Sequence, residues 1–357
     1  MTKILSKPEF IKELEKQTEA FLSDEQTSMA KLSGEAGQLA AYTKDTIMRN
    51  AKRTRPYLFY LAYRGLNPEG SDFPWNLAIA IELYHQFLLI HDDVIDHDLV
   101  RHGGPNVAGS YDEQLQSLIP QPGERLEMAT ALAILAGDVC FSWVYEQIAL
   151  AKLSATQQVA LGRSLHGITQ KEVAGQQLDI MSNSRDISQV TTEQILTIYD
   201  NKTAAYTLEL PINWALELSQ APPEQTKLWQ SFAQKVGRAY QISDDLIGLF
   251  SDSKTTGKPV GGDIREGKKT ILLRLAYENL ESADWQKVEA MLGKSFNQPQ
   301  LDDLLNLLKQ RGIYDQAVAM SETLVKEARA NLDGIKIAAA SRAELVSLID
   351  GLSTRKA

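Results

Sequence analysis

The spacing of hydrophobic residues along the chain predicts helices nearly throughout. The clearest helix face carries residues that recur three or four positions apart: Ile81, Tyr84, His85, Leu88, Asp92 and Asp96. Similar spacing appears near 129–150, 157–182, 192–218 and 226–250, and again through the C-terminal third. Thr191 and Gln194 have the spacing of a capping box at the start of a helix. Because regular alternation of apolar and polar residues is absent, we expect an all-α protein without a substantial sheet.

Turn signals rich in proline and glycine separate these helices. They lie at 66–70, 103–105, 119–123 and 256–262. None is long or biased enough in composition to be a linker, and we find no repeat period. We therefore expect a single domain that spans residues 1–357. Within it, residues 103–125 are expected to be the longest irregular segment, either a plain surface loop or a lid.

The composition narrows the class of protein. A chain of 357 residues with 43% hydrophobic and 23% charged residues is typical of a soluble globular protein. Its net charge of −9 argues against a general nucleic-acid binder, which needs a basic surface. Cys140 is the only cysteine, so no disulfide can form within the chain. Residues 1–8 lack the apolar run of a signal peptide. The most apolar stretch, 130–144, is interrupted at Gly137 and Asp138 and is too short to cross a bilayer. We expect a cytoplasmic protein with no membrane span.

Carboxylates form the most informative chemical pattern of the chain. Asp92, Asp93 and Asp96 lie within an apolar helical stretch, and a second pair follows at Asp244 and Asp245. Asp92 and Asp96 are four residues apart, so they project from one face of a helix and repel each other. A bridging divalent cation with hard oxygen ligands relieves this repulsion, and magnesium typically also binds substrate phosphates. The pattern predicts a site that handles a diphosphate.

Further polar residues extend this pattern. Gln176 and Asp179 form a third candidate group. Basic residues that could clamp phosphate oxygens lie at Lys52, Arg53, Arg55, Arg101, His102, Lys202, Lys258 and Lys268. Taken singly, each feature has an ordinary explanation: a solvated helix face, an exposed charge or a buried polar pair. Four histidines crowd one region, at 85, 91, 97 and 102, but the carboxylates beside them suit magnesium better than zinc.

Taken together, these residues resemble the trans-isoprenyl diphosphate synthases, the head-to-tail polyprenyl synthetases. Residues 52–56 are similar to the family's Gly-Gly-Lys-Arg-x-Arg-Pro element, with Asn50 and Ala51 in place of the glycines. The first aspartate-rich motif is matched by 89–96, and Arg-Arg-Gly-x-Pro by 101–105. Further matches follow in the family's order at 175–179, 202–203, 240–245, 257–258 and 263–270. The resemblance covers about 50–270 and implies a helical bundle of the isoprenoid synthase type around a central active-site cavity.

The resemblance also implies an activity and a role for each residue. The reaction is a magnesium-assisted condensation of isopentenyl diphosphate with an allylic diphosphate, carried out by a homodimer. Three magnesium ions with substrate bound, for which Mn²⁺ can substitute, are implied at Asp92, Asp93, Asp96, Asp179, Asp244 and Asp245. The allylic diphosphate is implied at Arg101, Gln176, Lys202 and Lys258. Isopentenyl diphosphate is implied in a metal-free pocket at Lys52, Arg55, His85, His102 and Lys268. The implied catalytic residues are Lys202, Thr203 and Gln241, and the last two direct oxygen dipoles toward the developing cation.

Two positions depart from the family pattern. Gly248 stands where the second motif usually has its third aspartate. His102 replaces the second arginine of a pair, and a neutral imidazole carries no full charge, so we expect weaker binding of isopentenyl diphosphate. The glycine opens an alternative, because 244–252 has the spacing of the second metal motif of class I terpene cyclases. A non-catalytic subunit of a heteromeric synthase is a further alternative.

The length of the product depends on residues upstream of Asp92. The resemblance implies a tunnel for the growing tail beneath the first motif, and Phe87, five residues before Asp92, favours a product of twenty carbons. Helix geometry instead keeps Leu88 and Tyr84 near the Asp92 face and points Phe87 away from it. Tyr84 lies about 12 Å below Asp92 at about 1.5 Å per residue. Geranylgeranyl diphosphate is the expected product, with farnesyl diphosphate as the alternative.

Overall fold

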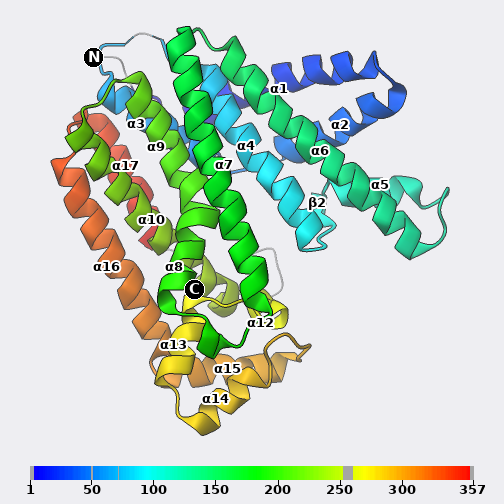
Figure 1. The fold of residues 1–357 in the computed structure, drawn as a ribbon, viewed down its shortest axis with the longest axis vertical. Coiled ribbons are helices and arrows are strands. Elements are labelled where there is room, and N and C mark those ends of the chain that lie inside the picture. Colours follow the sequence, from blue (N-terminus) through cyan, green and yellow to red (C-terminus); the bar gives the residue numbers. More distant parts are fainter. Residues whose placement is uncertain (1–3, 50, 71, 252–259, 354–357) are drawn as a thin grey trace. The chain divides into compact units, whose positions relative to one another are not determined.

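The computed structural model of the protein describes residues 4–49, 51–70, 72–251 and 260–353. This part of the chain is helical apart from one two-stranded hairpin (Figure 1), which confirms the predicted all-α class. The chain divides into two compact units, Met1–Gly162 and Arg163–Ala357, with the boundary inside one long helix. A single functional domain over 1–357 stays a prediction.

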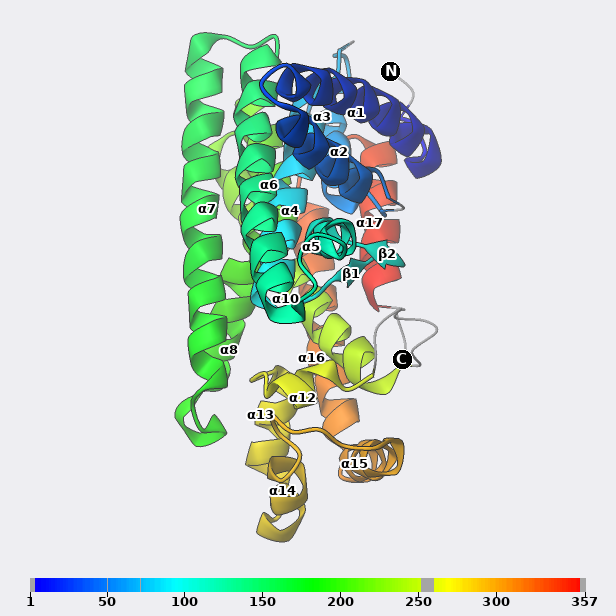
Figure 2. The same cartoon turned by 90° about the vertical axis from the view of Figure 1, so that its right-hand side faces the viewer.

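The first unit is built around one buried helix. Its elements are α1 (Lys7–Ala30), α2 (Gly34–Met48), α3 (Thr54–Leu66), α4 (Trp75–Ile95), β1 (Val100–Arg101), β2 (Gly104–Pro105), α5 (Val107–Leu115), α6 (Pro122–Leu150) and the start of α7 (Ala155–Asn183). Helix α4 packs along α6, and α1 lies against α2 (Figure 2). Because α4 is apolar on nearly all sides, it is buried on nearly all sides. The acidic residues therefore lie at the C-terminal end of a helix whose apolar part is firmly packed in the core.

Helix α6 runs without interruption through Gly137 and Asp138 and contains the helix predicted near 129–150. Gly137 has a packing role. A Cβ atom there would lie 2.2 Å from His91 Nε2, so only glycine lets the imidazole approach this closely. By length and composition alone, α6 could cross a membrane, and 39% of the relevant window is buried in the protein. Core helices of soluble proteins meet the same criterion, so this observation is weak evidence for a span.

The expectation of an irregular segment over 103–125 is wrong for most of its length. The strands β1 and β2 pair with Arg101 opposite Gly104. The two residues between them, His102 and Gly103, have φ values of 52° and 77°, as in a two-residue type I′ turn. Helix α5 follows at once, because the side chain of Asn106 accepts a hydrogen bond from the N–H of Gly109 at 2.8 Å and caps the helix. Arg101 is thus held in a tight hairpin.

The second unit contains the rest of α7 and a series of further helices. These are η1 (Ile187–Gln189), α8 (Thr192–Ile198), η2 (Tyr199–Glu209), α9 (Leu210–Leu218), α10 (Pro223–Phe250), α12 (Gly262–Glu266), α13 (Ile271–Asn279), α14 (Ser282–Glu289), α15 (Gln298–Gln310), α16 (Ile313–Gly334) and α17 (Ala339–Ser353). The capping box at Thr191 is confirmed. The helix expected over 192–218 is interrupted by η2, a π-helix. Helix α10 packs along both α16 and η2.

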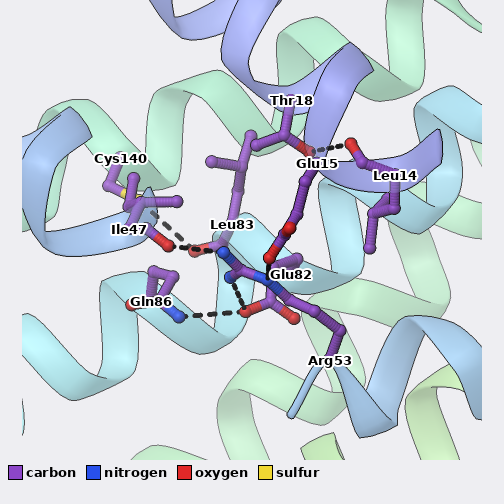
Figure 3. A network of polar contacts seen from close by, with 9 residues as sticks. All are labelled: Leu14, Glu15, Thr18, Ile47, Arg53, Glu82, Leu83, Gln86 and Cys140. Atoms are coloured by element: carbon purple, nitrogen blue, oxygen red, sulfur yellow. Dashed lines mark hydrogen bonds and ion pairs between the residues drawn. The ribbon is translucent and has the colours of Figure 1, made fainter. Parts of the chain in front are cut away.

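A buried ion pair fixes the start of α3 (Figure 3). Arg53 has a left-handed backbone, with φ at 45°, and precedes the helix. Its guanidinium donates to Glu82 of α4 (Nη1–Oε1 2.6 Å) and to the carbonyl of Ile47 (2.8 Å). Gln86 Nε2 donates to the same Glu82 oxygen at 2.9 Å. The side chains of Arg53 and Glu82 are only 1% and 2% exposed. This pair therefore anchors the segment that carries the predicted phosphate-binding residues on either side of Arg53.

Replacing Arg53 by methionine should leave the Glu82 carboxylate buried without its cation. Breaking a buried ion pair from one side costs about 3–5 kcal/mol, and we expect a loss of this size in the free energy of unfolding, measured by urea denaturation. Lys171→Met is the control, since it breaks a more exposed pair with Glu209 and should cost less than about 1 kcal/mol. Equal losses in the two variants would show that Arg53 is no anchor.

Candidate active site

A cavity of about 210 Å³ in the second unit gathers residues from four of the predicted motifs. Its polar lining includes Asp179, Lys202, Thr203, Gln241, Asp244, Asp245, Asp263 and Lys268, and Gly248 also faces it. Helices α7, η2 and α10 and the region around α12 supply these residues. Carboxylates and lysines thus alternate around one small space, as a binding site for an anion with a cation requires.

Close packing at a glycine places Asp179 beside Lys202. A Cβ atom on Gly175 would lie 2.4 Å from the backbone nitrogen of Lys202, so this glycine lets α7 lie directly against η2. One helical turn after Gly175, Asp179 accepts a hydrogen bond from Lys202, with Nζ–Oδ2 at 2.6 Å. The π-helix carries Lys202 and Thr203 into the cavity, and π-helical segments are frequent at functional sites.

The two aspartates of the second pair have different surroundings. Asp244 is partly exposed, whereas Asp245 is buried. Asp245 accepts a short hydrogen bond from the hydroxyl of Tyr199 and another from Gln241 Nε2 at 3.1 Å. Burial, and then the negative charge of Asp263, raise the pKa of Asp245 well above its usual range. The hydroxyl oxygen of Tyr199 also accepts from the N–H of Ile271 at 2.9 Å. Tyr199 therefore ties Asp245 to the start of α13.

The first acidic cluster lies at the C-terminal end of α4, where the helix dipole is unfavourable to negative charge. Asp93 is buried and accepts from Arg101 Nε at 2.6 Å. Burial raises the pKa of Asp93, and the hydrogen bond from Arg101 opposes the rise. Arg101 Nη2 also lies 4.0 Å from Asp92 Oδ2. Asp92 and Asp96 are partly exposed, so they remain accessible to a cation from outside.

The predicted pocket for isopentenyl diphosphate is strongly positive around His85. Burial, followed by the charges of Arg55 and Arg101, lowers the pKa of His85 well below its usual range. Burial, followed by Arg101, lowers the pKa of His102 as well. Both imidazoles are therefore neutral near pH 7. Lys52 is exposed and precedes Arg55 by three residues in the chain. The structure thus places four of the five residues expected in this pocket in the first unit, and Lys268 in the cavity of the second.

Aromatic rings form a layer between α4 and α6, below the first acidic cluster. The ring of Phe87 lies 5.7 Å from that of Tyr84, 4.9 Å from that of His91 and 4.7 Å from that of Phe141. Phe141 in turn lies 5.3 Å from Tyr145. Tyr84 is fully buried. The two α6 rings were missed from the sequence, although their spacing of four residues on a helix is a signal for one aromatic face.

Other predicted residues complete the inventory. Gln176 lies one helical turn before Asp179 on α7, and Leu88 is buried on α4. Lys258, expected at the allylic diphosphate, lies outside the described residues. Tyr199 and Asp263 also line the cavity, although neither has a predicted role. Tyr199 precedes Lys202 by three residues, and Asp263 begins the matched motif at 263–270, so proximity in the sequence was the only signal.

The donor set fits magnesium, although the part of the chain that the structure describes contains no ready-made ion cage. Among the described residues, no three histidine, cysteine or acidic side chains gather closely enough to hold a metal ion by themselves. Magnesium in phosphate-handling sites typically uses one or two carboxylates and completes its shell with water and substrate phosphates. The partly exposed carboxylates of Asp92, Asp96 and Asp244 could serve in this way.

Comparison with known proteins gives concordant results. A family model described as "Polyprenyl synthetase" matches residues 37–308. A short chain isoprenyl diphosphate synthase of Methanocaldococcus jannaschii is 30% identical over 268 residues, 75% of each chain. A geranylfarnesyl diphosphate synthase of Aeropyrum pernix is 27% identical over 318 residues, 87% of this chain and 92% of that one. Among solved structures, this chain is similar to the geranylgeranyl pyrophosphate synthase from Corynebacterium glutamicum complexed with isoprenyl diphosphate and magnesium. The two align with a TM-score of 0.91 at 25% identity, over 99% of this chain and 100% of that one.

Removing the hydroxyl of Tyr199 should loosen the acidic cavity. In Tyr199→Phe, the Asp245 carboxyl group and the N–H of Ile271 both lose a buried partner. Each loss of this kind costs about 1–3 kcal/mol, so the free energy of unfolding should fall by at least that amount in urea denaturation. Tyr277→Phe, which removes a hydroxyl from a partly exposed ring of α13, should change it by less than about 0.5 kcal/mol. An equal effect of the two substitutions would contradict this assignment.

Proposed function

Because the chain belongs to the polyprenyl synthetase family, we propose that it condenses isopentenyl diphosphate with an allylic diphosphate to make geranylgeranyl diphosphate. Its class is that of the prenyltransferases, and its type is the short-chain trans-prenyl diphosphate synthase. The observation that carries the proposal is the cavity in which carboxylates and lysines alternate. Similar proteins are named for different products, so the length of the product needs its own argument.

On the allylic side, the residues of this chain hold and balance a diphosphate. Magnesium bound there would supply the positive charge that lets the carbon–oxygen bond ionise. Three ions are expected, and manganese could replace them. Asp92, Asp96, Asp179 and Asp244 would hold the magnesium. Lys202 can leave its pair with Asp179 to contact a phosphate oxygen, because its ammonium is a mobile point charge. Arg101, Gln176 and, by its motif, Lys258 complete the binding of this diphosphate.

Asp93 and Asp245 hydrogen-bond to neighbouring side chains of the site. The sequence placed both among the metal ligands, yet Asp93 is engaged by Arg101, and Asp245 by Tyr199 and Gln241. We assign them the role of orienting those partners. Gln241 thereby keeps its amide oxygen directed away from Asp245, because its Nε2 donates to that carboxylate. Its oxygen and the Thr203 hydroxyl are then available to face the developing carbocation.

Isopentenyl diphosphate needs a pocket without metal, which the basic group around His85 supplies. Lys52 and Arg55 provide full charges, whereas neutral His85 and His102 provide single hydrogen-bond donors. The uncharged state of His102 supports weaker binding than an arginine would give. Lys268 is the remaining candidate for this diphosphate. The final proton loss needs no side-chain base, since the diphosphate released from the allylic substrate can accept the proton.

The aromatic layer supports a product of twenty carbons. Phe87 is packed between Tyr84 of α4 and Phe141 of α6. Its ring therefore cannot rotate away without disturbing the packing of these two helices. Such a layer below Asp92 closes the path of a growing apolar tail. Farnesyl diphosphate is the second candidate, since a closed layer near the acidic cluster also favours short products.

An exposed apolar face of α6 supports the proposed homodimer. Met128, Ile134, Leu135 and Tyr145 are between 42% and 52% exposed. They recur at helical spacing on one side of the helix. Burial of such a face against a second copy would remove it from water. Location in the cytoplasm stays a prediction.

The direct test is an incubation of the purified protein with labelled isopentenyl diphosphate and an allylic diphosphate. We expect a labelled prenyl diphosphate in the presence of magnesium, and its loss after chelation, restored by added magnesium or manganese. A hydrocarbon formed from the allylic diphosphate alone would instead identify a terpene cyclase. No product from either incubation would favour a non-catalytic subunit.

Removing the Phe87 ring should lengthen the product. In Phe87→Ala, the space between Tyr84 and Phe141 opens, so further isoprene units can enter, and chromatography of the dephosphorylated products should show C25 or longer chains. Tyr63→Ala removes a ring of α3 that contacts Phe59 instead and should leave the distribution unchanged. If Phe87→Ala keeps a C20 product, the tail ends elsewhere.

A further inference from the structure

The second acidic motif of this chain lacks one carboxylate, and the structure shows what stands next to the gap. Gly248 follows Asp244 by one helical turn on α10, so both face the same cavity. A Cβ atom built on Gly248 would have one neighbour within 4 Å, the Asp263 carboxylate oxygen Oδ2, at 3.7 Å. The carboxylate of Asp263 thus lies in the region that a side chain at position 248 would enter.

The backbone holds Asp263 at this place. The N–H of Gly261 donates to the carbonyl of Gly248 at 3.0 Å, which ties the start of α12 to α10. Gly261 and Gly267, at the two ends of α12, have φ values of 78° and 69°, which side chains rarely allow. The N–H of Lys268 donates to the carbonyl of Asp263 at 2.9 Å. Asp263 is therefore positioned by backbone contacts on both sides.

The contacts of Asp263 leave its carboxylate available to the cavity. Its ammonium neighbour, Lys268 Nζ, lies 3.9 Å from Asp263 Oδ1 but only 2.8 Å from Glu266 Oε2. Of these two carboxylates, Glu266 is thus the nearer partner of Lys268. Asp263 lines the same cavity as Asp179 and Asp244. A hard oxygen donor in this position suits magnesium or the water in its shell.

We infer that Asp263 supplies the carboxylate that Gly248 lacks, and that it helps to hold magnesium at the diphosphate, directly or through a bound water. The inference rests on the proposed function and adds one residue to its metal site. The competing role for Asp263 is a purely local one, in which it only holds Lys268.

The test measures the magnesium concentration that half-saturates binding of inorganic diphosphate, followed by calorimetry, so it does not depend on turnover. Asp263→Asn should raise this concentration on the order of 10- to 100-fold, as loss of an orienting partner at a metal typically does. Adding Gly248→Asp to Asp263→Asn should restore the half-saturating magnesium concentration to within about threefold of its value in the unaltered protein. A tenfold difference corresponds to about 1.4 kcal/mol, so the remaining difference is smaller than that. Glu266→Gln removes the nearer partner of Lys268 and is the matched control, expected to shift the half-saturating concentration by less than about twofold.

Several outcomes would overturn the inference. One is equal behaviour of Asp263→Asn and Glu266→Gln, and another is no recovery in the double variant, because a carboxylate at 248 cannot replace a mere partner of Lys268. If Asp263→Asn does not fold, Gly248→Asp alone decides: little gain in magnesium affinity is expected where the place is already filled, and a tenfold gain would overturn the inference. Absence of magnesium-dependent diphosphate binding in the unaltered protein would overturn the proposed function as well. If Asp263→Asn still forms the prenyl product and binds magnesium as the unaltered protein does, the inference is overturned and the proposed function stands.

Discussion

The cost of placing carboxylates in a protein interior governs this molecule, because a buried negative charge must have a cation or several hydrogen-bond donors beside it. Each unit meets that cost with named partners. Glu82 is held by Arg53, Asp93 by Arg101, and Asp179 by Lys202. Asp245 has no cation next to it among the described contacts and is held instead by the hydroxyl of Tyr199 and the amide of Gln241. The fold therefore depends on pairing its acids.

The same pairing explains how the site could change when a ligand arrives. Some pairs are internal and permanent, as the nearly inaccessible pair of Arg53 and Glu82 shows. Others face a cavity and are partly exposed, as Lys202 and Asp179 are, at 24% and 16%. A metal ion with a diphosphate brings both charges that such a pair needs, so the lysine can turn to a phosphate oxygen and the aspartate to the metal. Internal ion pairs therefore hold the helices in position, whereas ion pairs that face the cavity can exchange their partners for a ligand.

Much of this could be predicted from the sequence. Helical spacing was enough for the all-α class, and the capping box at Thr191 marked a true helix start. Three features failed for physical reasons. Residues 103–125 were expected to be irregular, but the two-residue turn at His102 and Gly103 and the cap at Asn106 let a hairpin and α5 form there, and both depend on local backbone geometry. The π-helix at Tyr199–Glu209 keeps the hydrophobic pattern of an α-helix closely enough to escape notice. Asp263 stood in a matched motif but had no predicted role, because its place beside Gly248 depends on a backbone contact between Gly261 and Gly248.

The proposed reaction requires the acidic residues of α4, and also those of α10, to hold a metal ion against a diphosphate, and this is its central claim. Crystals grown with Mn²⁺ and inorganic diphosphate, with anomalous diffraction to locate the metal, test it most directly. We expect manganese bound to diphosphate at the carboxylates of Asp92 and Asp96 and also at Asp244. A diphosphate bound with no metal at these residues, or metal at only one of the two helices, would contradict the account.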